Sequence, residues 1–295
     1  MHISGHYNMT IKSRPRLSCL TVFFLAIFLV NPCPILATAG NTPSNLVDKL
    51  ILDLGSTDLN IKRSAVVALG QTQDKKATKP LIQVMLKDKD DTSRAWAAGA
   101  LWNLKDTTAI PPLISALNDK YPLVRQSASG ALGDLKSTEA VNPLIRALKD
   151  EDIKVKINAI SGLGKIGDEK GLPHLIEFLK HERFDIRANA AKALGNIGLK
   201  EALDPLLELL RSDNNSGVRS AAAQALGRLR GQEAVDTLIK ALLFDNDENV
   251  RMNAALSLGE LKATSAIEDL TRVREKDVSK KVQWAVGQAL QILSQ

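Results

Sequence analysis

A short segment, Val124 to Leu135 (VRQSASGALGDL), recurs along most of the chain and constrains the fold more than any other feature. A constant period in the range found here is typical of stacked structural units that bury their apolar faces against one another. The chain is therefore expected to form a solenoid. Aligned on the leucine of the Ala-Leu-Gly triplet, the segments follow one another at steps of 31 or 32 residues, with that leucine at Leu69, Leu101, Leu132, Leu163, Leu194, Leu226, Leu258 and Leu290.

Each unit contains two predicted helices. Val124, Ala128 and Leu132 lie on one face at about 100° per residue, the spacing of an amphipathic helix that we call helix B. A second apolar pattern, such as residues 140–148 with Pro143 in the first turn, forms helix A. The sequence thus predicts an all-α fold, an α-solenoid built as a right-handed superhelix of about eight helical hairpins. The other A helices are predicted to begin near Pro80, Pro112, Pro173, Pro205, Ala234 and Ala266.

The two helices of a unit differ in the size of their side chains. The A helices are rich in leucine and isoleucine, whereas the B helices are rich in alanine, glycine and serine, as in residues 190–193 and 221–225. Small side chains let helices approach closely, so we expect the stack to curve with the B helices on its concave side. The helix angles also place Gln126, Gly130 and Gly133, with their equivalents in other units, opposite the core.

The first 39 residues do not follow the repeat and have the features of a secretory signal peptide. Three basic residues precede an uncharged run from Leu17 to Val30, and Ala37-Thr38-Ala39 supplies the small residues that a signal peptidase requires. The run of 14 residues is short for a bilayer span, so we predict cleavage, with a retained anchor as the alternative. Cys33 raises the question of lipidation, but proline precedes it where bacterial lipoprotein signals carry a small residue.

We therefore divide the chain into a cleaved secretory signal peptide (1–39), a linker (40–44) and a repeat solenoid (45–295). Both cysteines lie in the signal, so the mature chain would have no disulfide. It would also carry 36 basic and 33 acidic residues, a balance of +3 that gives no reason to expect nucleic-acid binding. We expect an exported bacterial protein of the periplasm or another extracytoplasmic compartment, with secretion into the medium and a thylakoid lumen left open.

A second repeated element places an acidic residue six positions before a basic residue that lies at the start of helix B. This spacing puts the carboxylate in the turn between the two helices and lets each cation reach its counterpart in the adjacent unit. Carboxylates in register can hold a metal ion, but each one here has a basic partner, so we interpret the set as a structural ladder. The fifth unit departs from it, with His181 in the acidic position before Arg187. The ladder consists of Asp88 and Arg94, Asp119 and Arg125, Asp150 and Lys156, Asp213 and Arg219, and Asp245 and Arg251.

The ladder, the period and the motif Val-Arg-x-x-Ala-x-x-Ala-Leu-Gly (124–133, 218–227 and 250–259) resemble HEAT-like repeats of the short type found in phycobilin lyase subunits and many bacterial proteins. The resemblance covers about residues 45–295 and implies an armadillo-like helical scaffold for binding. Deoxyhypusine hydroxylase has similar repeats but binds iron through several His-Glu pairs, of which only His181-Glu182 has a counterpart here. DNA glycosylases with such repeats need a basic concave groove, which this sequence does not supply.

The exposed positions of the B helices provide the candidate binding residues. Most are small or neutral, but Trp102 stands where six units have glycine, and three large apolar residues gather near the C-terminal end. Such side chains are common anchors at protein interfaces, although the two tryptophans among them can also fill packing gaps. The candidate partner-binding residues are Trp102, Ile157, Met252, Leu256 and Trp284.

No catalytic constellation emerges from the sequence, because the mature chain has no cysteine nucleophile, no phosphate-binding loop and no histidine pair spaced for zinc. We predict an exported, non-enzymatic scaffold that binds another protein on its concave helix-B surface. It is expected to use no cofactor or metal, to be a monomer, and to have no stable membrane span after signal cleavage. The alternative is an accessory or lyase-like subunit that binds a hydrophobic cofactor such as a tetrapyrrole.

Overall fold

A computed structural model describes residues 44–295, which fold into α-helices joined by short turns. The predicted signal peptide (1–39) and all of the predicted linker except Ser44 lie outside the described residues. Within 44–295, no helix combines the length and the apolar character that a bilayer span requires. The prediction of an all-α fold is confirmed.

The 16 α-helices of this region pair into eight helical hairpins, which confirms the predicted α-solenoid. We number the hairpins as units 1 to 8 in chain order. The A helices are α2 (Ser44–Asp53), α4 (Thr78–Lys87), α6 (Ile110–Ala116), α8 (Val141–Ala147), α10 (Leu172–Phe178), α12 (Leu203–Ser212), α14 (Val235–Phe244) and α16 (Ile267–Lys276). The B helices are α3 (Leu59–Gln71), α5 (Asp91–Leu104), α7 (Pro122–Leu135), α9 (Ile153–Ile166), α11 (Phe184–Ile197), α13 (Ser216–Leu229), α15 (Glu248–Glu260) and α17 (Lys280–Leu293).

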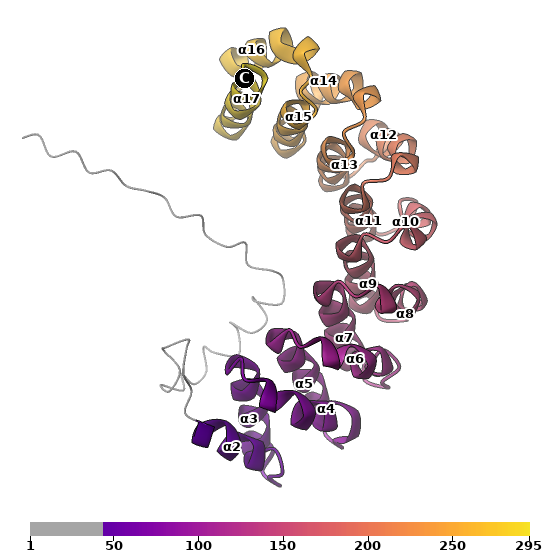
Figure 1. The fold of residues 1–295 in the computed structure, drawn as a ribbon. Coiled ribbons are helices and arrows are strands. Elements are labelled where there is room, and N and C mark those ends of the chain that lie inside the picture. Colours follow the sequence, from indigo (N-terminus) through magenta and orange to yellow (C-terminus); the bar gives the residue numbers. More distant parts are fainter. Residues whose placement is uncertain (1–43) are drawn as a thin grey trace, which may run out of the picture. The chain divides into compact units, whose positions relative to one another are not determined.

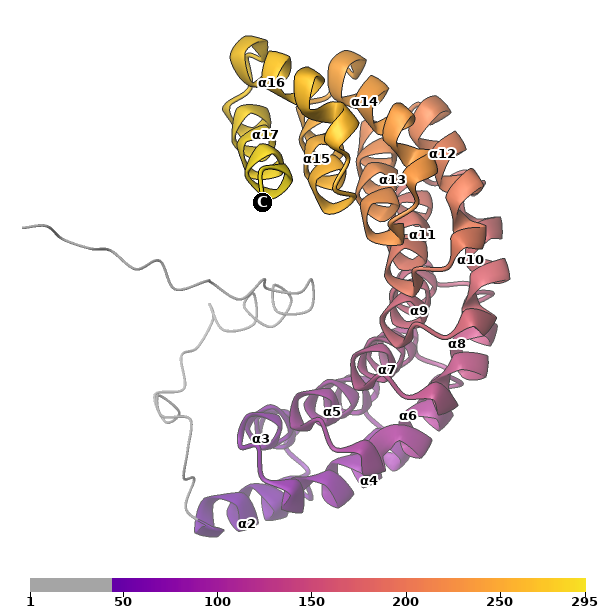
Figure 2. The same ribbon diagram turned by 45° about the horizontal axis from the view of Figure 1, so that its top comes forward.

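The eight units stack side by side. Each A helix packs on the B helix of its own unit, and each B helix also packs on the B helices of neighbouring units. Figures 1 and 2 show that the B helices form the inner row of an arc and the A helices its outer row. The B helices therefore line the concave side, as predicted, and we call their inner row the concave surface.

Close contacts between successive B helices explain the glycines of the repeated segment. A Cβ atom added to Gly133 would lie 2.5 Å from the Cα atom of Gly162 in the next B helix, and one added to Gly164 would lie 2.6 Å from the Cα atom of Ala193. Packed interiors do not accommodate such short distances. Our assignment of Gly133 to the side opposite the core is therefore wrong, because this residue is buried. Helix α7 packs on its own A helix and also on the B helices of the units before and after it, so both of its flanks are covered.

The length of helix A sets the period of the repeat. In the 32-residue steps helix A has ten residues, and its last turn closes with an α-type bond such as Asp88 N–H to the Val84 carbonyl (3.0 Å). In the 31-residue steps (α6, α8 and α10) it has seven, and the turn closes with a tighter bond such as Asp119 N–H to the Ala116 carbonyl (3.1 Å). Removing one residue thus converts the last turn to 3₁₀ geometry.

The B helices from α5 to α13 each end at a residue in the left-handed conformation. Gly167 and Gly198 have φ values of 77° and 76°, whereas Lys105, Lys136 and Arg230 adopt 51° to 53° without being glycine. A 3₁₀ turn then leads into the next helix A, a feature that our sequence analysis did not predict. These turns are η1 (Lys75–Ala77), η2 (Thr107–Ala109), η3 (Thr138–Ala140), η4 (Glu169–Gly171), η5 (Lys200–Ala202), η6 (Gln232–Ala234) and η7 (Thr264–Ala266).

Replacing Lys136 by glycine is expected to raise the free energy of unfolding by about 0.5–1 kcal/mol, because the strain of an L residue in this conformation exceeds the entropy that glycine adds to the unfolded chain. The Lys136 side chain is exposed, so the change removes little else. Urea denaturation followed by circular dichroism measures the difference. Gly167→Lys is the reverse control and should destabilise the fold; equal stability of Lys136→Gly and the wild type would contradict this account.

Candidate functional site

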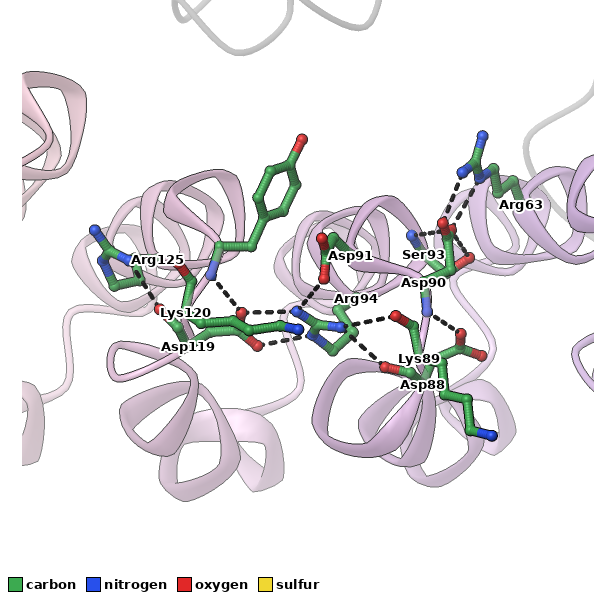
Figure 3. A network of polar contacts seen from close by, with 11 residues as sticks. Arg63, Asp88, Lys89, Asp90, Asp91, Ser93, Arg94, Asp119, Lys120 and Arg125 are labelled. Atoms are coloured by element: carbon green, nitrogen blue, oxygen red, sulfur yellow. Dashed lines mark hydrogen bonds and ion pairs between the residues drawn. The ribbon is translucent and has the colours of Figure 1, made fainter.

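The ladder residues of successive units meet at the turns between helix A and helix B (Figure 3). Arg94 of unit 2 places Nε 2.8 Å and Nη2 2.9 Å from the carboxylate oxygens of Asp119 in unit 3. Its Nη1 donates to the main-chain carbonyl of Asp88 in its own unit at 3.0 Å. One guanidinium thus fixes its own turn and binds the next unit. The same two-nitrogen contact, which we call a fork, joins Arg125 to Asp150, Arg187 to Asp213, Arg219 to Asp245 and Arg251 to Asp277. Lys62 makes a single ion pair with Asp88.

Each ladder carboxylate also fixes the turn that follows it. An oxygen of Asp119 accepts the main-chain N–H of Tyr121 at 2.8 Å, and Asp277 accepts that of Ser279 in the same way. The hydrogen bond from the Arg251 guanidinium holds the pKa of Asp277 below its usual range, which keeps the carboxylate charged. These oxygens are therefore occupied by the protein itself. Across residues 44–295, no group of three or more His, Cys, Asp or Glu side chains is arranged to hold a metal ion.

The turn of unit 5 differs from the others because His181 occupies the ladder position. Its Nδ1 accepts the N–H of Arg183 at 3.1 Å, a contact that an aspartate oxygen makes elsewhere, and its ring stacks on Phe178 with the centroids 6.0 Å apart. Lys156, the ladder cation of unit 4, forms no ion pair among the residues that the structure describes. We call each ion pair between ladder residues of successive units a rung. The rung between units 4 and 5 is missing.

Two interfaces have a second polar contact on the inner side of the stack, which was not predicted. Arg63 forms a fork with Asp90, the residue that caps the next helix B, with distances of 3.0 and 2.7 Å. Gln126 stands at the equivalent position and donates to the capping Asp152 at 3.1 Å. The capping aspartates follow ladder aspartates at a spacing of two, so the Asp-x-Asp pattern was the available signal. Arg63 also lies over the ring of Trp96, 6.0 Å from its centroid.

The candidate binding residues lie on four B helices. Met252 and Leu256 are one turn apart on α15, and Trp284 is on the neighbouring α17. Ile157 on α9 and Trp102 on α5 lie in units 4 and 2, so the structure does not bring the five residues together in one place (Figure 2). Trp284 is 60% exposed, whereas the other four are half-buried and pack against the core.

Trp102 lies beside a cavity of about 480 Å³ at the edge where α3, α5 and α7 end. At this position other units have a glycine in close contact with the next B helix, as Gly133 shows. A tryptophan Cβ atom requires a wider spacing than that contact allows. The cavity thus coincides with the departure from the repeat, and its lining includes Gly70, Gln71, Gln73, Asn103, Lys105, Asp134 and Leu135.

Met252 borders a second cavity, of about 380 Å³, where the inner sides of α11, α13 and α15 meet. Its lining is mainly polar and includes Lys192, Gln224 and Asp247. Asn253 also lines it and donates to the hydroxyl of Ser220 at 2.7 Å. The concave surface therefore combines apolar side chains with hydroxyl and amide groups.

A search of curated proteins gave no match to this chain. Among solved structures, the Escherichia coli protein YibA is similar over 96% of this chain and 100% of its own, with 20% identity and a TM-score of 0.61. The complex of CpcE and CpcF of phycocyanin lyase from Nostoc contains a chain similar over 90% of this chain and 99% of its own, with 21% identity and a TM-score of 0.52. A structure of Kap95p with RanGDP contains a chain similar over 84% of this chain and 40% of its own, with 14% identity and a TM-score of 0.58.

At these identities the structural similarities establish the fold and leave function open. The sequence comparison is more specific, because the family model for HEAT repeats matches three overlapping stretches, residues 78–152, 141–227 and 205–291. Together they span most of the chain, and the resemblance noted in the sequence is confirmed. The chain belongs to the HEAT-repeat family.

Proposed function

We propose that this chain is an exported, non-enzymatic scaffold that binds another protein on its concave surface. The observation that carries the proposal is Trp284, a large aromatic side chain that is 60% exposed on the inner row of helices. Exposed aromatic residues bordered by polar groups are typical of protein-binding sites. Its neighbours Met252 and Leu256 extend the apolar area onto α15.

The ladder supports the proposal in a second way. Its directional ion pairs hold successive units in register, so most of the concave surface is ordered before any partner arrives. A preorganised surface loses little conformational entropy on binding, which improves affinity without additional contacts. Two of the structural neighbours, CpcE with CpcF and Kap95p with RanGDP, are complexes between proteins. Export rests on the signal-peptide features of residues 1–39.

Affinity capture from the extracytoplasmic fraction of the source organism tests the proposal. Trp284→Ala is expected to reduce the captured partner at least about tenfold, the effect typical of an interface anchor. Phe244→Ala is the matched control, because Phe244 is 76% exposed but belongs to α14 in the outer row. Capture that Trp284→Ala leaves unchanged, or that Phe244→Ala abolishes, would contradict the concave site.

A second candidate function rests on the cavity beside Trp102. With a volume of about 480 Å³ and Trp102 on its wall, this cavity has room for part of a hydrophobic cofactor such as a tetrapyrrole, and its polar lining offers the Lys105 ammonium to an acidic group alongside the carboxylate of Asp134. An accessory or lyase-like subunit would then show visible absorbance when purified from its source. Titration with a tetrapyrrole would quench tryptophan fluorescence, and Trp102→Ala would abolish the quenching. Neither signal is expected of a scaffold that binds only protein.

A further inference from the structure

Polar side-chain contacts join the successive units at every interface of the described solenoid except one. Six interfaces have a ladder ion pair, and most of these also have additional hydrogen bonds between side chains or from a side chain to the main chain. The ladder pairs are Lys62–Asp88, Arg94–Asp119, Arg125–Asp150, Arg187–Asp213, Arg219–Asp245 and Arg251–Asp277.

The exception is the interface between units 4 and 5. The ladder contact is missing because His181 stands where the other units have an acid for the preceding cation. The inner contact that Arg63 and Gln126 make elsewhere is absent too, as it is where Ala95 and Ala188 stand in units 2 and 5. Ile157 occupies this position, and the capping residue Arg183 pairs with Asp185 of its own unit at 2.9 Å. Across residues 44–295, this is the interface that no side-chain hydrogen bond or ion pair crosses.

Apolar contacts still hold the two units together. Gly164 of α9 packs closely on Ala193 of α11, and Ile160 and Leu163 are fully buried. Such contacts are strong but have little directional preference, whereas a bidentate arginine–carboxylate pair fixes both distance and orientation. The interface therefore keeps its cohesion while lacking the contacts that set the angle between the units elsewhere.

We propose that the interface between units 4 and 5 is a hinge, about which units 1–4 and units 5–8 change their relative angle. The pivot is the close contact between α9 and α11. Hinges of this kind move about a few positions while the flanking elements stay rigid. The candidate binding residues are divided by it, since Trp102 and Ile157 precede the hinge and Met252, Leu256 and Trp284 follow it. The curvature of the concave surface would then adapt to a partner.

Distance distributions between two spin labels test the hinge in the full chain. Labels carried by unnatural amino acids avoid the native cysteines. One pair replaces Lys120 and Glu182 and spans the hinge; the other replaces Lys89 and Glu151 and spans two interfaces with intact rungs. All four side chains are exposed, and both pairs are 62 residues apart, so the two spans are matched. The distribution across the hinge is expected to be about twice as wide.

Two sets of variants locate the cause. Lys156→Arg combined with His181→Asp rebuilds the missing rung and should narrow the Lys120–Glu182 distribution to the width of the control. Asp119→His removes the rung between units 2 and 3 and should widen the Lys89–Glu151 distribution instead. Equal widths for the two pairs in the wild type would overturn the proposal. A Lys120–Glu182 distribution that stays broad in the Lys156→Arg/His181→Asp variant, while its helical content equals that of the wild type, would overturn it as well.

Discussion

Replacing Gly133 by alanine is expected to lower the free energy of unfolding by about 2–3 kcal/mol, even though alanine favours helix formation over glycine by about 1 kcal/mol. The added Cβ atom would lie 2.5 Å from the Cα atom of Gly162, and this neighbour is main chain that cannot rotate away. Helices α7 and α9 must therefore separate along their contact and lose packing on both sides. Urea denaturation followed by circular dichroism measures the effect.

Gly287→Ala is the matched control for this prediction. Gly287 is also in the middle of a B helix, but an added Cβ atom would have no neighbour within 4 Å because α17 is the last helix of the stack. Only the helix propensity remains, so this substitution should stabilise the fold by about 0.5–1 kcal/mol. Opposite signs at the two positions are the expected result, and destabilisation at both would show that helix contact is not the reason for the repeated glycine.

Replacing Arg125 by methionine is expected to destabilise the solenoid by about 3–4 kcal/mol at neutral pH. The side chains of Arg125 and Asp150 are each only 10% exposed, so the substitution leaves a largely buried carboxylate without its partner. It also removes the hydrogen bonds of Nη1 to the carbonyls of Asp119 and Lys120, at 2.8 and 3.2 Å. Adding Asp150→Asn should restore part of the loss, because the unpaired charge disappears.

The pH dependence provides a second check on the same pair. Burial is the largest single effect and raises the pKa of Asp150, but the hydrogen bonds from Arg125 and from the Asp152 N–H, together with the charge of the Arg125 guanidinium, outweigh it and hold the pKa below its usual value. A carboxyl group with a lowered pKa in the folded state contributes stability above its unfolded pKa, near pH 4, and loses that contribution as the pH falls through the folded value. The difference between wild type and Arg125→Met should therefore shrink between pH 7 and pH 3. A difference independent of pH would contradict the ion pair.

The repeat, the paired helices and the acidic and basic positions could all be predicted from the sequence, because each depends on spacing alone. The position of Leu132 and its seven equivalents fixed the number of units, and the glycine- and alanine-rich B helices indicated which row lies inside the curve. The departure of His181 from the ladder was visible as well. The absence of any other polar side-chain contact across this interface was not visible, since it depends on which partners side chains such as Ile157 and Arg183 meet in the folded stack.

The surroundings of each B helix were harder to predict. Helix angles distinguish the side facing its own helix A from the opposite side, but they do not show that B helices of two other units cover the flanks. For that reason Gly133 was assigned to the side opposite the core, and the space beside Trp102 was not foreseen. The 3₁₀ turns before helix A also escaped prediction, because short segments such as residues 138–140 carry no periodic signal.

Site-specific photo-crosslinking in the extracytoplasmic fraction tests the central claim, binding of a protein on the concave surface, most directly. One crosslinking amino acid replaces Gln288 on α17, beside Trp284, and the other replaces Gln83 on α4 in the outer row; both residues are exposed glutamines. We predict one discrete crosslinked protein from Gln288 and none from Gln83, with loss of the Gln288 product in Trp284→Ala. A product that forms from Gln83, or one from Gln288 that persists without Trp284, would contradict the account.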